Sequence, residues 1–327
     1  MSIRNIASVF IIIIYAACRK SNYIPPVVPV SPVIPDSLLK WKEIGQIPGS
    51  SASDIFFNSP AKGFAAGDQI YRTNDSGRNW IGIPGTSSNQ GNFFNLFFTD
   101  SQNGFAEGTS QMAFTNDGGD NWIIKPLASA WAYTLFFINS QVGFYGDQQG
   151  GGLYKTNDGG NTWKSIFKSS SATDKYYPHF LDLDTGFVMT ESGMFESTTD
   201  GGQTWNFKCY VSNVSGGGSY SQLQFLNRND GYFGGPTGVL KTTDGGQTWI
   251  NELPATIISH VNYIKFFNDQ SGYYKNATSI YYTVDGGGTW ELSCSIGRGD
   301  FIIAMSFLDD HSGWACTNKG RVFRLQQ

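Results

Sequence analysis

The chain has 327 residues with 22 basic and 26 acidic side chains, a formal net charge of −4, and 15% of its residues are aromatic. This composition argues against a nucleic-acid-binding protein, which needs a concentrated basic face. The 40 glycines, together with the aromatic residues, favour a protein of short strands and tight turns.

Residues 1–18 are typical of an export signal that ends in a lipidation site. Arg4 precedes an apolar stretch of about 12 residues, which is too short to span a bilayer as a helix. Ala16, Ala17 and Cys18 resemble the end of a bacterial lipoprotein signal, in which the cysteine is lipidated and becomes the new N-terminus, although Tyr15 stands where leucine is usual. An ordinary secretory signal with an incidental cysteine is the alternative.

Residues 19–38 are predicted to form an extended stalk. Five of the 12 prolines of the chain fall between residues 25 and 35. Proline at this density favours polyproline II, which rises about 3.1 Å per residue. An export signal, a lipid anchor and a stalk together place the protein at a bacterial cell envelope, facing the periplasm or the exterior.

An eight-residue motif, TNDGGNTW at residues 156–163, is one of six similar copies, with their aspartates 41 to 44 residues apart. An active site needs one copy of a motif, whereas a constant period near 42 residues indicates a repeat architecture. The aspartates of the six copies are Asp75, Asp117, Asp158, Asp200, Asp244 and Asp285.

A second motif, glycine followed by an aromatic residue, occurs seven times at the same period, from Gly63-Phe64 to Gly313-Trp314. A short apolar run precedes each copy. Each unit therefore reads as four strands: A is the apolar run, B follows the glycine-aromatic pair, C precedes the aspartate motif, and D begins at its tryptophan. Residues 39–327 are predicted to form an all-β, seven-bladed β-propeller with four-stranded blades.

The ends of the chain indicate how the ring closes. The last unit has strands A, B and C but no D, and residues 41–47 are strand-like with no A, B or C before them. We therefore expect this N-terminal strand to pair with the C-terminal blade and complete it.

The aspartate motif resembles the Asp-box, or bacterial neuraminidase repeat, over nearly all of the chain after residue 38. With its spacing and the glycine-aromatic pairs, the chain looks most like the photosystem II stability/assembly factor group of seven-bladed propellers and its relatives in non-photosynthetic bacteria. Sialidases, some glucan hydrolases and sortilin-type receptors share the box. The resemblance therefore implies the fold and does not choose the function.

The six boxes are predicted to be structural, with glycines in left-handed turns and aspartates accepting hydrogen bonds from turn amides. Partner binding is expected on the opposite face, where the D-to-A loops differ in length and carry aromatic residues suited to a protein or a glycan. Packing of these rings at blade edges is the alternative. The candidate ligand-binding residues are Trp131, Tyr133, Tyr176, Tyr177, Tyr210 and Tyr220.

The sequence favours a non-catalytic, monomeric protein without a cofactor or a metal. His179, His260 and His311 lack ligand spacing, and Cys209, Cys294 and Cys316 are an odd number whose state the sequence leaves open. The alternative is a glycan hydrolase, sialidase-like or glucanase-like, that uses two loop carboxylates. The carboxylates in suitable loops are Asp68, Glu107, Asp147, Asp174, Glu191 and Asp300.

Overall fold

A computed structural model of the chain describes residues 40–49, 52–87, 92–109, 111–126, 132–147, 152–168, 174–212, 214, 222–253, 260–297 and 299–326. Within these ranges no helix has the length and apolarity that a bilayer span requires. The predicted signal, lipidation site and stalk lie outside them.

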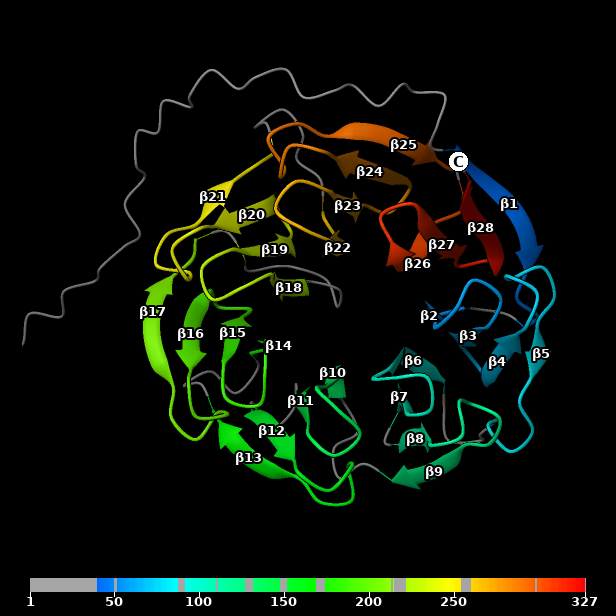
Figure 1. Cartoon of the computed structure of the whole chain (residues 1–327), viewed down its shortest axis with the longest axis horizontal. Coiled ribbons are helices and arrows are strands. Elements are labelled where there is room, and N and C mark those ends of the chain that lie inside the picture. The colour runs from blue at the N-terminus through cyan, green and yellow to red at the C-terminus, as the bar shows by residue number, and fades with distance from the viewer. Residues whose placement is uncertain are drawn as a thin grey trace, which may run out of the picture.

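Seven antiparallel sheets of four strands stand around a central axis (Figure 1). The predicted seven-bladed propeller is confirmed. Blades 1 to 3 consist of β2 (Asp54–Phe57), β3 (Gly63–Ala66), β4 (Ile70–Thr73) and β5 (Ile81–Gly82); β6 (Phe93–Phe98), β7 (Gly104–Gly108), β8 (Gln111–Thr115) and β9 (Ile123–Pro126); and β10 (Ala132–Phe137), β11 (Gly143–Asp147), β12 (Gly152–Thr156) and β13 (Lys164–Phe167).

Blades 4 to 6 repeat the same order of four consecutive strands, with the first strand innermost. They consist of β14 (Tyr176–Phe180), β15 (Gly186–Thr190), β16 (Met194–Thr198) and β17 (Asn206–Tyr210); β18 (Gln222–Phe225), β19 (Gly231–Gly235), β20 (Gly238–Thr242) and β21 (Ile250–Asn251); and β22 (Tyr263–Phe266), β23 (Gly272–Lys275), β24 (Ser279–Thr283) and β25 (Glu291–Ser295). Two predicted strand boundaries are off by one or two residues. Strand B begins at the glycine of the glycine-aromatic pair and not after the pair, and strand D begins just after the box tryptophan and not at it.

Blade 7 combines the two ends of the chain, as predicted. It contains β26 (Ile302–Asp309), β27 (Ser312–Thr317) and β28 (Arg321–Gln326), and β1 (Lys40–Gln46) is its outer strand. In Figure 1 the blue β1 lies directly beside the red β28. β1 runs antiparallel to β28, with Lys40 opposite Gln326 and Gln46 opposite Arg321.

The glycine-aromatic motif joins each blade to the next. Phe144 of blade 3 stacks on Phe180 of blade 4 with ring centroids 3.8 Å apart. A Cβ atom on Gly186 would lie 2.4 Å from the same Phe180 ring, so the residue opposite that ring must be glycine. All seven junctions have such a stacked pair, with centroids 3.5 to 4.7 Å apart: Phe64–Phe98, Phe105–Phe137, Phe144–Phe180, Phe187–Phe225, Tyr232–Phe266, Tyr273–Phe307 and Trp314–Phe57.

The box tryptophan packs edge-on against the inner-strand phenylalanine of its own blade. In blade 4 the Trp205 and Phe180 centroids are 6.1 Å apart with an interplanar angle of 81°. Blade 7 has no box, and Trp41 of β1 takes this place against Phe307 at 6.0 Å and 87°. Edge-to-face and stacked arrangements are the geometries that aromatic pairs prefer. The same three-ring cluster therefore builds the core of every blade.

Candidate functional site

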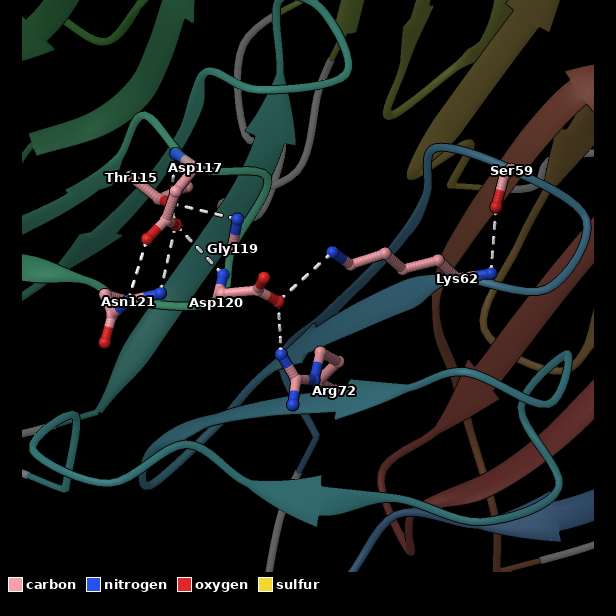
Figure 2. A network of polar contacts seen from close by, with 8 residues as sticks. All are labelled: Ser59, Lys62, Arg72, Thr115, Asp117, Gly119, Asp120 and Asn121. Carbon is pink, nitrogen blue, oxygen red and sulfur yellow. Dashed lines mark hydrogen bonds and ion pairs between the residues drawn. The ribbon is translucent and has the colours of Figure 1, made fainter.

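The Asp-box is a closed hydrogen-bonded turn, drawn for blade 2 in Figure 2. The Thr115 hydroxyl donates to Asp117 Oδ1 at 2.7 Å and accepts the Gly119 amide at 2.9 Å. Asn121 donates its backbone amide to Asp117 Oδ1 and its side-chain Nδ2 to Oδ2, at 3.0 and 2.8 Å. The carboxylate that would attract a ligand is thus occupied by its own turn.

The glycines of the box adopt the predicted left-handed backbone, with φ of +74° at Gly118 and +85° at Gly119. In blade 1 the first of the two positions is a serine, Ser76, which also has a positive φ of 68°. Asn, Asp and Gly tolerate this region more readily than serine. The constraint on the first position therefore comes from the turn, which imposes its backbone geometry even on a non-glycine residue.

Each box is tied to the A-to-B turn of its own blade. The amide after the box aspartate donates to the carbonyl four residues beyond the inner-strand phenylalanine, as Gly118 does to Gln102 at 2.8 Å. We call this side of the ring, with its boxes and A-to-B turns, the box face. The D-to-A and B-to-C connections lie at the other ends of the same strands, and we call that side the loop face.

Some boxes also contact the preceding blade. Asp120 of the blade 2 box forms ion pairs with Arg72 and Lys62 of blade 1, at 2.5 and 3.4 Å (Figure 2). Lys155 of blade 3 donates to the Gly201 carbonyl in the blade 4 box at 2.8 Å. Charged groups of the box face therefore contact the neighbouring blade at these two junctions.

The box hydrogen bonds predict a loss of stability in acid. Donation by the Thr162 side chain and amide lowers the pKa of Asp158 from 3.8 to about 2, and all six box aspartates have lowered pKa values. A lowered pKa contributes stability above the unfolded value of about 3.8 that is lost as pH falls through the folded value. We expect the urea midpoint of unfolding to fall steeply between about pH 4 and 2. A midpoint that stays constant over this range would contradict the structural role of the boxes.

On the inner strands, polar side chains satisfy the backbone of the next blade. Asp54 Oδ2 accepts the Leu96 amide at 2.7 Å, and Gln222 Oε1 accepts the Ile264 amide at 3.3 Å; each pair spans 42 residues, one full period. An inner strand is a sheet edge with unpaired backbone groups. These hydrogen bonds satisfy some of the unpaired backbone groups of the inner strands. The polar side chains that form them therefore have a structural role.

The candidate aromatic residues divide into core, surface and undescribed positions. Tyr176 and Tyr177 belong to β14 and are only 1% and 4% exposed. Both rings are packed in the core, so the prediction that they reach the rim is wrong for these two: β14 starts earlier than the loop pattern indicated. Trp131 and Tyr220 lie outside the described residues, and Tyr133 lies in β10 with its side chain undescribed.

Tyr210 is the described candidate that reaches the surface. It ends β17, the outer strand of blade 4, on the loop-face side, and is 50% exposed. Phe207 of the same strand is also 50% exposed, and its ring centroid lies 5.1 Å from that of Tyr210. Exposed contiguous apolar surface is typical of interaction sites. Phe207 was not predicted from the sequence, although its spacing from Tyr210, three residues along a predicted outer strand, was the available signal.

The six carboxylates of the hydrolase alternative are spread over five blades, with Asp174 and Glu191 both in blade 4, and neighbouring groups contact most of them. Asp68 accepts the Tyr71 hydroxyl at 2.7 Å. Glu191 pairs with Lys175 at 3.3 Å. The other two are Asp174, which accepts the Ser192 amide, and Asp300, which pairs with Arg321. Asp147 and Glu107 are buried. Glu107 and Asp147 thus lie in strands β7 and β11 and not in the predicted loops, while the other four carboxylates contact neighbouring groups.

The buried Glu107 side chain predicts a second pH dependence of the stability of the fold. Its side chain is fully buried, Asn95 Nδ2 donates to Oε2 at 2.8 Å, and burial raises its pKa from 4.5 to about 7. A raised pKa contributes stability that is present below pH 4.5 and lost as pH rises to about 7. We expect Glu107→Gln, relative to the parent, to gain about 2 to 3 kcal/mol in unfolding free energy between pH 4 and pH 8. Urea titrations at both pH values measure this gain, and an equal difference at both would contradict it.

Cysteine and histidine residues form no obvious chemical site in the described part of the chain. Cys209, Cys294 and Cys316 are not in disulfides, and the Cys209 thiol donates to the Gly246 carbonyl at 3.3 Å. Asp309, Asp310 and His311 have ligand-type atoms within 4.8 Å of one another on the box face. There, His311 Nδ1 already contacts Asp310 Oδ1 at 2.5 Å.

Comparison with known proteins finds a family of propellers that matches part of this chain. The family model described as "Photosynthesis system II assembly factor YCF48" matches residues 172–297, which span blades 4 to 6. The predicted resemblance is confirmed. A curated relative, "Photosystem II assembly lipoprotein Ycf48" of Synechococcus sp. (strain CC9902), is 30% identical over 122 residues, 36% of this chain and 36% of that protein. The match thus spans about a third of the relative's length.

Solved structures extend the likeness to the whole ring. YCF48 from Cyanidioschyzon merolae superposes with a TM-score of 0.69 over 88% of this chain and 99% of that chain, at 17% identity. A second structure, "YCF48 bound to D1 peptide", gives a TM-score of 0.67 over 88% of this chain and 97% of the other, at 16% identity. At these identities the superpositions establish a common fold.

Proposed function

We propose that this chain is a non-catalytic cell-envelope lipoprotein whose propeller holds a protein partner on its loop face, as an assembly factor does. The name of the curated relative, an assembly lipoprotein, and the peptide bound to one structurally similar propeller support this proposal. The observation that carries it is the difference between the two faces. Box carboxylates are occupied by their own turns, whereas Phe207 and Tyr210 form an exposed aromatic pair on β17, which reaches the loop face at Tyr210.

The position of β1 indicates which face of the ring lies away from the predicted membrane anchor. Strand D of each blade starts at the box face, and Lys40, the first residue of β1, pairs there with Gln326. The chain before Lys40 therefore joins the ring at the box face. With the predicted anchor at Cys18 and stalk at residues 19–38, the loop face is the side remote from the attachment point and accessible to a partner.

The aromatic pair tests the proposal. We expect the double variant Phe207→Ser/Tyr210→Ser to migrate as free chain on native gels of detergent-solubilised membranes, where the parent migrates in a larger complex. Exposed aromatic anchors carry much of the binding energy of protein interfaces. The melting temperature should change little, because both rings are half exposed.

The matched control is Ile81→Ser, which removes an exposed apolar side chain, 70% exposed, from the outer strand β5. This variant should stay in the complex. A double variant that stays in the complex like the control would contradict the proposed surface, and a parent that migrates only as free chain would contradict partner binding altogether.

Substitution of Cys18 tests the predicted lipid anchor separately. We expect Cys18→Ser to move the protein from the membrane fraction to the soluble fraction, because acyl chains supply the attachment and the Pro-rich stalk offers little apolar area. Fractionation and immunoblotting measure the change. Full retention of the variant in membranes would show that something other than a lipid on Cys18 holds the protein there.

A further inference from the structure

The residue before the inner-strand phenylalanine occupies an equivalent position in all seven blades, on the strands nearest the axis of the ring (Figure 1). We call these seven residues the axial belt. In six blades the belt side chain contacts the next blade, by ring packing in blades 1 to 3 and by hydrogen bonds to the backbone in blades 4, 5 and 7. The belt residues are Phe56, Phe97, Phe136, His179, Gln224, Lys265 and Ser306.

The polar belt residues of blades 4 and 5 show how such side chains are used. Gln224 Oε1 accepts the Phe266 amide, and Gln224 Nε2 donates to the Phe266 carbonyl, both at 2.8 Å. His179 Nε2 lies 3.1 Å from the Phe225 carbonyl oxygen, to which it donates. Each of these side chains therefore has its partner in the backbone of the next blade.

Lys265 of blade 6 is the exception in the belt. Among the residues that the structure describes, its ammonium has no hydrogen bond and no ion pair, and it lies over the Phe267 ring, 5.9 Å from the centroid. Burial lowers the pKa of Lys265, and no neighbouring carboxylate offsets this effect. A buried charge is costly unless it is paired, and an unpaired buried group calls for a bound ion or water.

Other titratable groups near the axis do not supply the missing negative charge. The two carboxylates of the inner strands, Asp54 and Asp309, each accept a backbone amide, at 2.7 and 2.9 Å. Burial, with the positive charge of Lys265 adding to it, lowers the pKa of His179 to about 4, so this imidazole is neutral at pH 7. Lys265 is therefore a cation whose counter-ion has to come from outside the described chain.

Ser306, the belt residue of blade 7, offers a second donor at the same junction. Its Oγ accepts the Phe57 amide at 2.8 Å, and no described residue accepts its hydroxyl hydrogen. The ring of Phe267, over which the Lys265 ammonium lies, contacts Phe307, the residue after Ser306, with centroids 5.6 Å apart. The ammonium and the hydroxyl thus belong to the same junction, and both are donors suited to an oxyanion.

We infer that Lys265 and Ser306 bind a small oxyanion, a phosphate or a carboxylate, at the axis between blades 6 and 7. The ammonium supplies the charge, and the hydroxyl adds a directed hydrogen bond. Lys265 and the three phenylalanines of the belt are partly exposed, so a small solute can reach this level of the axis. The site lies on inner strands and not on the outer strand β17, so it goes beyond the partner surface proposed above.

Thermal melting of the full chain in detergent tests the inference, with sodium phosphate or sodium acetate replacing sodium chloride at constant ionic strength. A ligand that binds the folded state raises the melting temperature, and we expect a rise of about 2 °C or more for at least one of the two anions. Phosphate also stabilises proteins by exclusion from their surface. The decisive quantity is therefore the rise in the parent minus the rise in Lys265→Met, which removes the charge and keeps much of the side-chain volume.

Lys265→Met should lose most of the rise, and Ser306→Ala should lose about half of it. The control Lys164→Met, on an exposed position of the outer strand β13, should keep the full rise. The inference is overturned if neither anion raises the melting temperature of the parent above its value in chloride, or if Lys265→Met keeps the rise, which would leave Lys265 simply hydrated. Should Lys265→Met fail to fold, Ser306→Ala decides, and an unchanged rise in that variant would overturn the site.

Discussion

Gly186→Ala should lower the free energy of unfolding by about 3 kcal/mol, a large effect for one methyl group. The new Cβ atom would lie 2.4 Å from the Phe180 ring, which is held between Phe144 at 3.8 Å and Trp205 at 6.1 Å. Phe180 cannot move aside without breaking the stacked junction between blades 3 and 4. Urea unfolding of the variant and the parent measures the difference.

The control for this substitution is Gly297→Ala. Nothing lies within 4 Å of a Cβ atom built at Gly297, and its φ is not in the left-handed region. Its unfolding free energy should stay within about 0.5 kcal/mol of the parent value. Equal effects of the two substitutions would show that the glycine-aromatic motif is not the junction described above.

Deletion of residues 39–47 should cost at least about 5 kcal/mol, comparable to the whole stability of many domains. The deletion removes Trp41, the edge-on partner of Phe307, and Ile47, which is 2% exposed in the core shared by blades 7 and 1. It also leaves β28 as an open edge that other chains can pair with. Thermal melting and light scattering should show a lower midpoint and aggregation.

A deletion of residues 27–33 is the matched control, since it shortens the predicted stalk and leaves β1 intact. This variant should melt like the parent. A ring without residues 39–47 that melts like the parent as well would contradict closure by β1.

The repeats explain why so much of the fold was predictable from sequence. A motif that returns every 42 residues or so fixes the number of blades, and the order A, B, C without D at the C-terminus identifies the missing strand. The strand positions follow from glycines that must face a ring and from turns that need a positive φ, as at Gly118. These requirements are local, so they are visible in the sequence.

The candidate site was less predictable because exposure depends on where a strand begins. Tyr176 and Tyr177 stand in a polar, loop-like stretch, yet β14 starts at Tyr176 and buries both rings. Tyr210 remains at the surface because it ends an outer strand, and Phe207 joins it across a bulge that sequence does not reveal. The burial of the carboxylates was also not visible in the sequence, because the buried contacts of Glu107 depend on the register of the paired strands.

Site-specific photo-crosslinking in intact cells tests most directly whether the loop face carries the partner. A photoreactive residue is placed at Tyr210 or Ala277, exposed on the loop-face side, and at Arg78 or Asn161, exposed in the boxes. Partner binding on the loop face predicts adducts with a protein from the first two positions and none from the second two. Adducts that form at Arg78 and Asn161 but not at Tyr210 and Ala277 would contradict it, and would make the boxes the binding face.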